Sequence, residues 1–329
     1  MDMHKLISII ITVDNTQESD LSIPLSSINN QIGFDFSQLE VLVVDNGAYK
    51  LRNAELFSIF ANLDLKYLKL DQVLATSKAL QYGIDHATGD YVTLMSPNSQ
   101  LNQSSIFQSY VTQLQAHQTS DVLSGLVMEQ TITQQLEEQY TVGRNDQSIY
   151  ARWFRREFLR QNGITFREDF GDYAPEYVCR LANQFAQEDV KIEEVGYVKF
   201  SSRNLVNNAH LDGSGSINGD WLKMMSSYLL KLQEVDQQLY VNEFSQFVVR
   251  FYTQLKQVPR MNRAEIMQSL KSLVGKNVLA WGYTQQFINN LRIQDRSPQA
   301  PWNAESGKFF SYVNELTQYL QSYGLAVKP

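Results

Sequence analysis

The sequence predicts an α/β protein with a mostly parallel sheet flanked by helices, followed by a helical C-terminal region. Short apolar, β-branched runs alternate with longer helical stretches as far as about residue 200, which is the pattern of strand–helix–strand units. After about residue 218 the apolar residues recur at the helical period. The 329 residues are enough for roughly two domains. We therefore expect a sheet domain over 1–206, a linker over 207–219 and an α-helical domain over 220–329.

Four strands and one helix can be located in the first domain. Residues 6–13 and 39–45 are almost continuously apolar, as expected of strands that are buried on both faces. Residues 65–70 alternate between polar and apolar, and 91–95 form a fourth apolar run. The helical period over 75–86 ends at Ala87-Thr88-Gly89, which is a typical helix stop. This order predicts parallel strands joined by helices.

The second half shows apolar stripes at helical spacing. One stripe begins at Trp221, a second at Phe244, and the last runs from Phe309 to Tyr323. The run Gly-Ser-Gly-Ser at 213–216 is typical of a linker. We interpret the stripes as the core of a helical domain. A groove for a partner, or contact with a second copy of the chain, is the alternative role of these helices.

Charge and cysteine content exclude several classes of protein. With 28 basic and 35 acidic residues the net charge is −7, which argues against a nucleic-acid binder or a polybasic membrane anchor. The single cysteine, Cys179, excludes an internal disulfide and fits a reducing compartment. We expect neither a signal peptide nor a transmembrane segment, because no apolar run is long enough. The predicted location is the cytoplasm, with a peripheral position at the inner face of the membrane as an extension.

Polar residues follow three of the predicted strands. They are Thr12 and Asp14 after the first, Asp45 after the second, and Ser96 and Asn98 after the fourth. In open α/β sheets, ligands bind beyond the carboxyl ends of the strands. A carboxylate there can accept hydrogen bonds from a base N–H or a ribose hydroxyl. The alternative is that the two acids only stabilise turns. The sequence contains neither GxGxxG nor GxxxxGK[ST], which weakens the case for a dinucleotide fold or a P-loop.

Four segments in order resemble family 2 glycosyltransferases with the GT-A fold. They are residues 7–15, 39–47, 77–92 and 149–168, and the resemblance covers about residues 5–205. It implies a GT-A-like, Rossmann-like domain that transfers a sugar from a nucleotide-sugar donor to an acceptor hydroxyl. The acceptor would be a carbohydrate, lipid-linked or protein group in surface polysaccharide, cell-wall or glycoprotein assembly. The family's donor site corresponds here to Thr12, Asp14, Asp45, Gln81, Ser96 and Asn98.

The sequence departs from the family at its metal-binding motif. The family carries Asp-x-Asp after the fourth strand, where carboxylates bind a divalent cation that neutralises the donor diphosphate. Here the stretch is Ser96-Pro97-Asn98-Ser99, without a carboxylate. The family's Arg-Asn pair is Leu80-Gln81, and its second Asp after the second strand is Asn46. We therefore assign no metal ligand and no cofactor, and expect Mg²⁺ or Mn²⁺ to bind at most weakly.

The resemblance also suggests catalytic and acceptor residues. The family's base is an aspartate in a Glu-Asp pair, and spacing favours Asp172, then Glu176, then Asp169. The alternative is a solvated acidic helix start. Trp153 and Arg156, in a cluster with two further arginines, are candidates for holding an anionic acceptor or lipid phosphate. Solvated helix arginines are the plainer interpretation. Two functions remain open: an inverting glycosyltransferase, or an inactive relative that binds or scaffolds.

Overall fold

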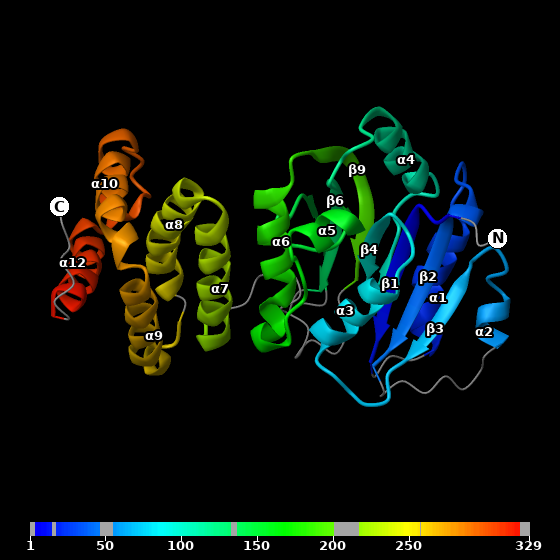
Figure 1. Ribbon diagram of the computed structural model, residues 1–329, viewed down its shortest axis with the longest axis horizontal. Coiled ribbons are helices and arrows are strands. Elements are labelled where there is room, and N and C mark those ends of the chain that lie inside the picture. The colour runs from blue at the N-terminus through cyan, green and yellow to red at the C-terminus, as the bar shows by residue number, and fades with distance from the viewer. Residues whose placement is uncertain are drawn as a thin grey trace. The chain divides into compact units, whose positions relative to one another are not determined.

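The computed structural model describes residues 4–14, 18–46, 55–132, 137–200, 217–256 and 258–322. The chain divides into two compact units, residues 1–214 and 215–329. Figure 1 shows the first unit as a sheet with helices and the second as helices. Most of the predicted linker, residues 207–216, lies outside the described residues.

The first unit is built on one twisted, mostly parallel sheet (Figure 1). Its strand order is β3-β2-β1-β4-β8-β6-β9-β5, with β7 paired to β6. Strands β1 to β4 are parallel to one another, β6 is parallel to β9, and β5, β7 and β8 run antiparallel to their neighbours. The strands are β1 (Ile7–Val13), β2 (Leu39–Asp45), β3 (Leu65–Lys69), β4 (Tyr91–Met95), β5 (Ser99–Gln100), β6 (Val122–Ile132), β7 (Glu138–Gly143), β8 (Arg152–Arg155) and β9 (Asp189–Lys199).

The four predicted strands are confirmed as β1, β2, β3 and β4, and their apolar runs explain their positions. All seven residues of β2 and all five of β4 are buried, because these strands lie inside the sheet with helices on its faces. The third strand, β3, lies at the edge of the sheet and is partly exposed. The alternating pattern of residues 65–70 reflects this edge position.

Helices of the first unit cover the sheet, and α3 packs closely on β1. A Cβ atom on Gly83 would lie 2.5 Å from Cγ2 of Ile10, so only glycine lets α3 approach β1 this closely. The helices are α1 (Glu18–Asn29), α2 (Glu55–Ser58), α3 (Thr76–His86), α4 (Ile106–Ala116), α5 (Arg156–Gln161) and α6 (Ala174–Phe185), with short 3₁₀ turns η1 (Phe36–Gln38) and η2 (Glu168–Tyr173).

The second unit is helical throughout its described part. The stripes that begin at Trp221 and Phe244 form buried faces of α7 and α8, and Phe309 belongs to the buried face of α12. None of the described helices combines the length and hydropathy that a bilayer crossing needs. The helices are α7 (Gly219–Val235), α8 (Gln237–Leu255), η3 (Arg260–Asn262), α9 (Arg263–Lys276), α10 (Val278–Gln294), α11 (Pro301–Ala304) and α12 (Ser306–Ser322).

Candidate functional site

A crevice of about 180 Å³ lies at the carboxyl ends of β1, β2 and β4. Four of the six predicted donor-binding residues line it: Thr12, Asp14, Ser96 and Asn98. They meet because parallel strands that share one direction end at the same edge of the sheet. The first turn of α3, beginning at Thr76, forms another part of the lining. We call this cavity the donor crevice.

The residues at the end of β2 form hydrogen bonds within the fold next to the donor crevice. The Asn46 amide pairs with the backbone of Leu74, donating to its carbonyl at 2.8 Å and accepting from its N–H at 2.9 Å. Asp45 is fully buried and accepts a hydrogen bond from the Tyr67 hydroxyl. Asp45 does not line the crevice, whereas its neighbour Asn46 does, so the predicted contact between Asp45 and the donor stays a prediction.

The turn that replaces the family's metal motif is held by its own hydrogen bonds. The Ser96 N–H donates to the Tyr197 hydroxyl at 3.0 Å, and the Asn98 N–H donates to Ser96 Oγ at 3.2 Å. Ser99 Oγ donates to the Ser96 carbonyl at 2.5 Å. The Asn98 side chain lines the crevice and bonds to no described residue. Asn98 is therefore the group of this turn that remains available to a ligand.

Tyr150 lines the crevice, although the sequence analysis did not predict it as a site residue. Its position depends on contact with a strand that is distant in sequence. Its ring stacks on Tyr197 of β9, with centroids 4.8 Å apart and planes inclined by 8°. Burial raises the pKa of Tyr197 to about 12, so its hydroxyl stays protonated at neutral pH. The next residue, Ala151, has a φ of 55°, a backbone region that residues other than glycine rarely adopt.

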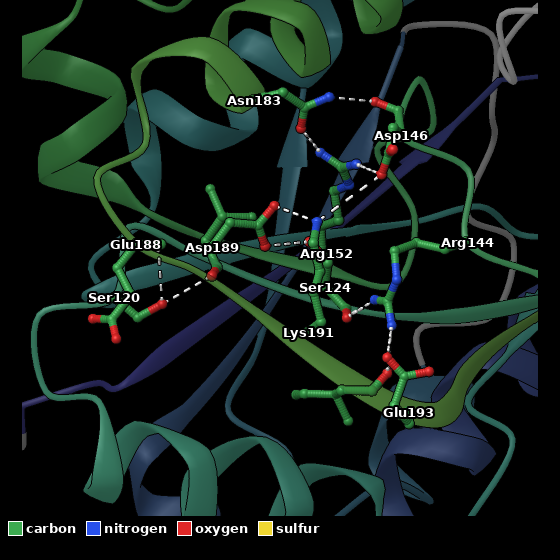
Figure 2. A network of polar contacts seen from close by, with 12 residues as sticks. Ser120, Ser124, Arg144, Asp146, Arg152, Asn183, Glu188, Asp189, Lys191 and Glu193 are labelled. Atoms are coloured by element: carbon green, nitrogen blue, oxygen red, sulfur yellow. Dashed lines mark hydrogen bonds and ion pairs between the residues drawn. The ribbon is translucent and has the colours of Figure 1, made fainter.

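A polar network holds the segment that carries Tyr150 (Figure 2). Arg152 is 1% exposed, and its guanidinium donates to Asn183 Oδ1 at 2.7 Å and contacts Asp146 Oδ1 at 3.4 Å. Arg144 donates to the Ser124 carbonyl and, at 2.8 Å, to Glu193. These bonds tie residues 144–152 to β6, β9 and α6, so they fix the backbone on which Tyr150 stands.

The predicted acceptor residues lie away from the donor crevice. Residues 152–155 form strand β8, not a solvated helix. The Trp153 ring is 2% exposed and packs against Tyr110 at 4.8 Å. Arg156 donates to the carbonyls of Ala87 and Gly89 at 2.8 Å each, at the opposite end of the parallel strands. The acceptor role of both residues is therefore inconsistent with their positions.

The carboxylates predicted as a base have different surroundings. Asp172 is exposed in η2, after a kink at Gly171, and η2 packs against α3. Glu176 is 2% exposed and bonds to Arg180 at 2.7 Å, so its carboxylate is held inside the fold, and its role as base stays a prediction. Asp169 pairs with Arg167 at 2.8 Å. Of the three, only Asp172 has an exposed carboxylate without an ion pair among the described residues.

Gln81 lies outside the donor crevice, and the crevice contains few potential metal ligands. Gln81 does not line the crevice, because its amide accepts from the Phe166 N–H at 2.9 Å and donates to Asp85 at 2.8 Å. Asp14 is the sole carboxylate among the described lining residues. No cluster of three or more potential metal ligands occurs in the described part of the chain. Asp14 with neutral Ser96 and Asn98 supplies one carboxylate at a site where the family's motif supplies two, and weak binding of Mg²⁺ or Mn²⁺ stays a prediction.

Comparisons with known proteins agree with this architecture. The chain matches the model described as Glycosyl transferase family 2 over residues 8–173, about half of its length. No curated protein matches it. Among solved structures, TarS 1–349 of S. aureus in complex with UDP-GlcNAc has a TM-score of 0.68 at 15% identity, covering 98% of this chain and 93% of that chain. TarS 1–349 alone has a TM-score of 0.67 at 15% identity, covering 96% and 91%. The structural likeness shows a GT-A fold, and the sequence match shows that the chain belongs to glycosyl transferase family 2.

Proposed function

We propose that the chain binds a nucleotide sugar in the donor crevice without a divalent cation and transfers the sugar to an acceptor hydroxyl. The observation that carries this proposal is a set of polar side chains at the carboxyl ends of β1 and β4 that form no hydrogen bond with a described residue. The side chains of Thr12, Asp14 and Asn98 line the crevice and bond to no described residue. Ligands of α/β sheets bind at such an edge.

Each of these groups has a chemical task in donor binding. The Asp14 carboxylate is suited to accept hydrogen bonds from a ribose hydroxyl or a base N–H. The diphosphate would lie toward the first turn of α3, where Thr76 lines the crevice and no side chain caps the helix. The amino end of a helix carries partial positive charge and free N–H groups, which stabilise an anion. Asn98 would supply a neutral amide in place of a metal-bound oxygen.

Calorimetry with a panel of nucleotide sugars, with EDTA and with Mn²⁺, tests this proposal. We expect binding that changes little between the two conditions. Asp14→Asn should weaken it about tenfold or more, because a hydrogen bond to a charged group is lost. Asp220→Asn, an exposed acid in the helical unit, is the matched control and should bind as the wild type does. Absence of nucleotide-sugar binding, or equal binding by Asp14→Asn, would contradict the proposal.

A second candidate function is a non-catalytic binding or scaffolding subunit. It is favoured by the coordinated loss of charge at the reacting end: Ser96 and Asn98 in place of carboxylates, and Glu176 held by Arg180. Radiolabelled donor with a mixed set of acceptors separates the two candidates. Transfer or donor hydrolysis above the blank favours the enzyme. Donor binding without either reaction favours the scaffold.

A further inference from the structure

A second cavity, of about 450 Å³, lies between α1 and the segment 100–104. We call it the α1 groove. None of the described residues that line it is charged; nine of the eleven carry a hydroxyl or a carboxamide, and the other two are Ile23 and Leu101. The segment 96–104 lines both cavities, since Ser96 to Asn98 line the donor crevice and Gln100 to Ser104 line the groove.

Hydrogen bonds between the two walls make the α1 groove a preformed feature. The Leu101 N–H donates to Ser27 Oγ at 3.1 Å, and the Ile32 N–H donates to the Ser104 carbonyl at 2.7 Å. Gln31, which is 4% exposed, donates from Nε2 to the Gln103 carbonyl at 2.8 Å. Its Oε1 accepts from the Phe107 N–H at 3.1 Å. The two walls are therefore connected through the side chains of Ser27 and Gln31 and through backbone groups.

Six polar side chains of the α1 groove are left with their full hydrogen-bonding capacity. They bond to no other residue in the part of the chain that the structure describes, whereas the three other polar lining residues, Ser22, Ser27 and Gln31, do. Each can donate and accept, because hydroxyls and carboxamides carry both kinds of group. The six are Ser26, Asn30, Gln100, Asn102, Gln103 and Ser104.

We propose that the α1 groove binds a neutral saccharide. Sugar hydroxyls also donate and accept at once, and the C–H face of a sugar ring can lie on Ile23 and Leu101. Carboxylated or phosphorylated ligands are disfavoured, because the lining offers no cation and the chain carries a net charge of −7. The size is within the range of ligand pockets.

The role of the bound saccharide follows from the shared segment. Residues 96–98 line the donor crevice and residues 100–104 line the groove, so one short segment connects the two cavities. The bound saccharide would then be part of the acceptor or of the lengthening product. This role rests on the proposed function, whereas saccharide binding by the groove does not.

The test is a titration of the full chain with neutral tetrasaccharides and without any nucleotide. Maltotetraose, cellotetraose and tetra-N-acetylchitotetraose are the probes, followed by calorimetry and NMR, with tetragalacturonate as the anionic comparison. We expect at least one neutral probe to bind, and Asn102→Ala with Gln103→Ala to weaken it about tenfold, since two neutral hydrogen bonds are lost. Ser26→Phe should abolish it by filling the groove. Gln286→Ala with Asn290→Ala, two exposed amides of α10, should leave it unchanged.

The outcomes separate this inference from the proposed function. Nucleotide-sugar affinity of the groove variants should equal that of the wild type, and Asp14→Asn should leave tetrasaccharide binding intact. The inference is overturned if no neutral probe binds at 10 mM, if the groove variants bind normally, or if tetragalacturonate binds as well as the neutral probes. Circular dichroism of each variant shows whether a loss reflects unfolding instead, and Asn102→Ser is then the milder replacement.

Discussion

The two ends of the parallel strands contain similar residues but use them differently. At the amino end, Glu40 is fully buried and accepts hydrogen bonds from Ser8 at 2.5 Å, Thr88 N at 2.6 Å and Lys66 at 2.7 Å. At the carboxyl end, Asp14 is exposed and bonds to no described residue. Residue type therefore does not separate an acid that is bonded inside the fold from one that stays open to solvent. The difference lies in whether the fold itself supplies the partners.

At the amino end, basic side chains also form their hydrogen bonds within the fold. Arg156 uses its guanidinium on the carbonyls at the end of α3, and Lys5 donates to the carbonyls of Ser37 and Leu39 at 3.0 Å each. Buried polar groups are satisfied because an unpaired one costs about 1–3 kcal/mol. At the carboxyl end, exposure removes that requirement, so polar groups can remain open to a ligand.

The largest expected effect is on stability, from Glu40→Ala. The change leaves Ser8 Oγ and the Thr88 N–H without their acceptor inside the fold, so the free energy of unfolding should fall by about 3 kcal/mol or more. Denaturant titration measures it. Glu157→Ala, which breaks an exposed pair with Arg160, is the control and should lower the free energy of unfolding far less, because solvent screens an exposed pair. Equal effects of the two changes would break the comparison.

The second effect concerns turnover at the open end. If the wild type transfers sugar, Asp172→Asn should lower kcat by about 10²-fold, the scale of a positioned general base. Its melting temperature should stay close to that of the wild type, because the carboxylate is exposed. Asp169→Asn, on the same turn, is the matched control. Full turnover in Asp172→Asn would exclude this aspartate, and a loss confined to Asp169→Asn would transfer the role.

A smaller effect is expected from restoring carboxylates in the donor crevice. Ser96→Asp with Asn98→Asp should make UDP bind about tenfold more tightly with Mn²⁺ than with EDTA, because hard cations require anionic oxygen ligands. The wild type should show little difference. Asn102→Asp with Ser104→Asp places the same spacing in the α1 groove and should create no such dependence. Metal-sensitive UDP binding by the wild type would contradict our interpretation of the crevice.

The smallest effect is the pH dependence that comes from Glu40. Burial raises the pKa of this carboxyl, but hydrogen bonds from Lys66, Ser8 and Thr88 outweigh burial and lower it below the usual 4.5. The folded state then binds fewer protons than the unfolded state between the two pKa values. The stabilisation is complete above about pH 4.5 and is lost as the pH falls through the lowered pKa. Glu40→Gln should flatten this acid limb in denaturant titrations, and an unchanged limb would show that other acids cause it.

Strands β1 to β4 were predictable because the burial of a strand is reflected in the local pattern of apolar residues. Continuous apolar runs marked β1, β2 and β4, and an alternating run marked the edge strand β3. Strand β8 was not foreseen, since its four residues are rich in arginine. Arg152 bonds to Asn183, which is distant in sequence, and to nearby Asp146, while Arg155 pairs with distant Asp121.

The sequence by itself determined the parallel strands β1 to β4, the helical second half and the edge where Thr12, Asp14, Ser96 and Asn98 meet. These features follow from local periodicity and from the shared direction of parallel strands. Only the tertiary structure decided which polar residues stay available. Asp45 is bonded to Tyr67, Glu176 to Arg180 and Gln81 to Phe166, while Trp153 is enclosed by other rings. Tyr150 joins the crevice with its ring stacked on Tyr197 of the distant strand β9. Hydrogen bonding and desolvation depend on neighbours that are far apart along the chain, so residue type and spacing could not reveal them.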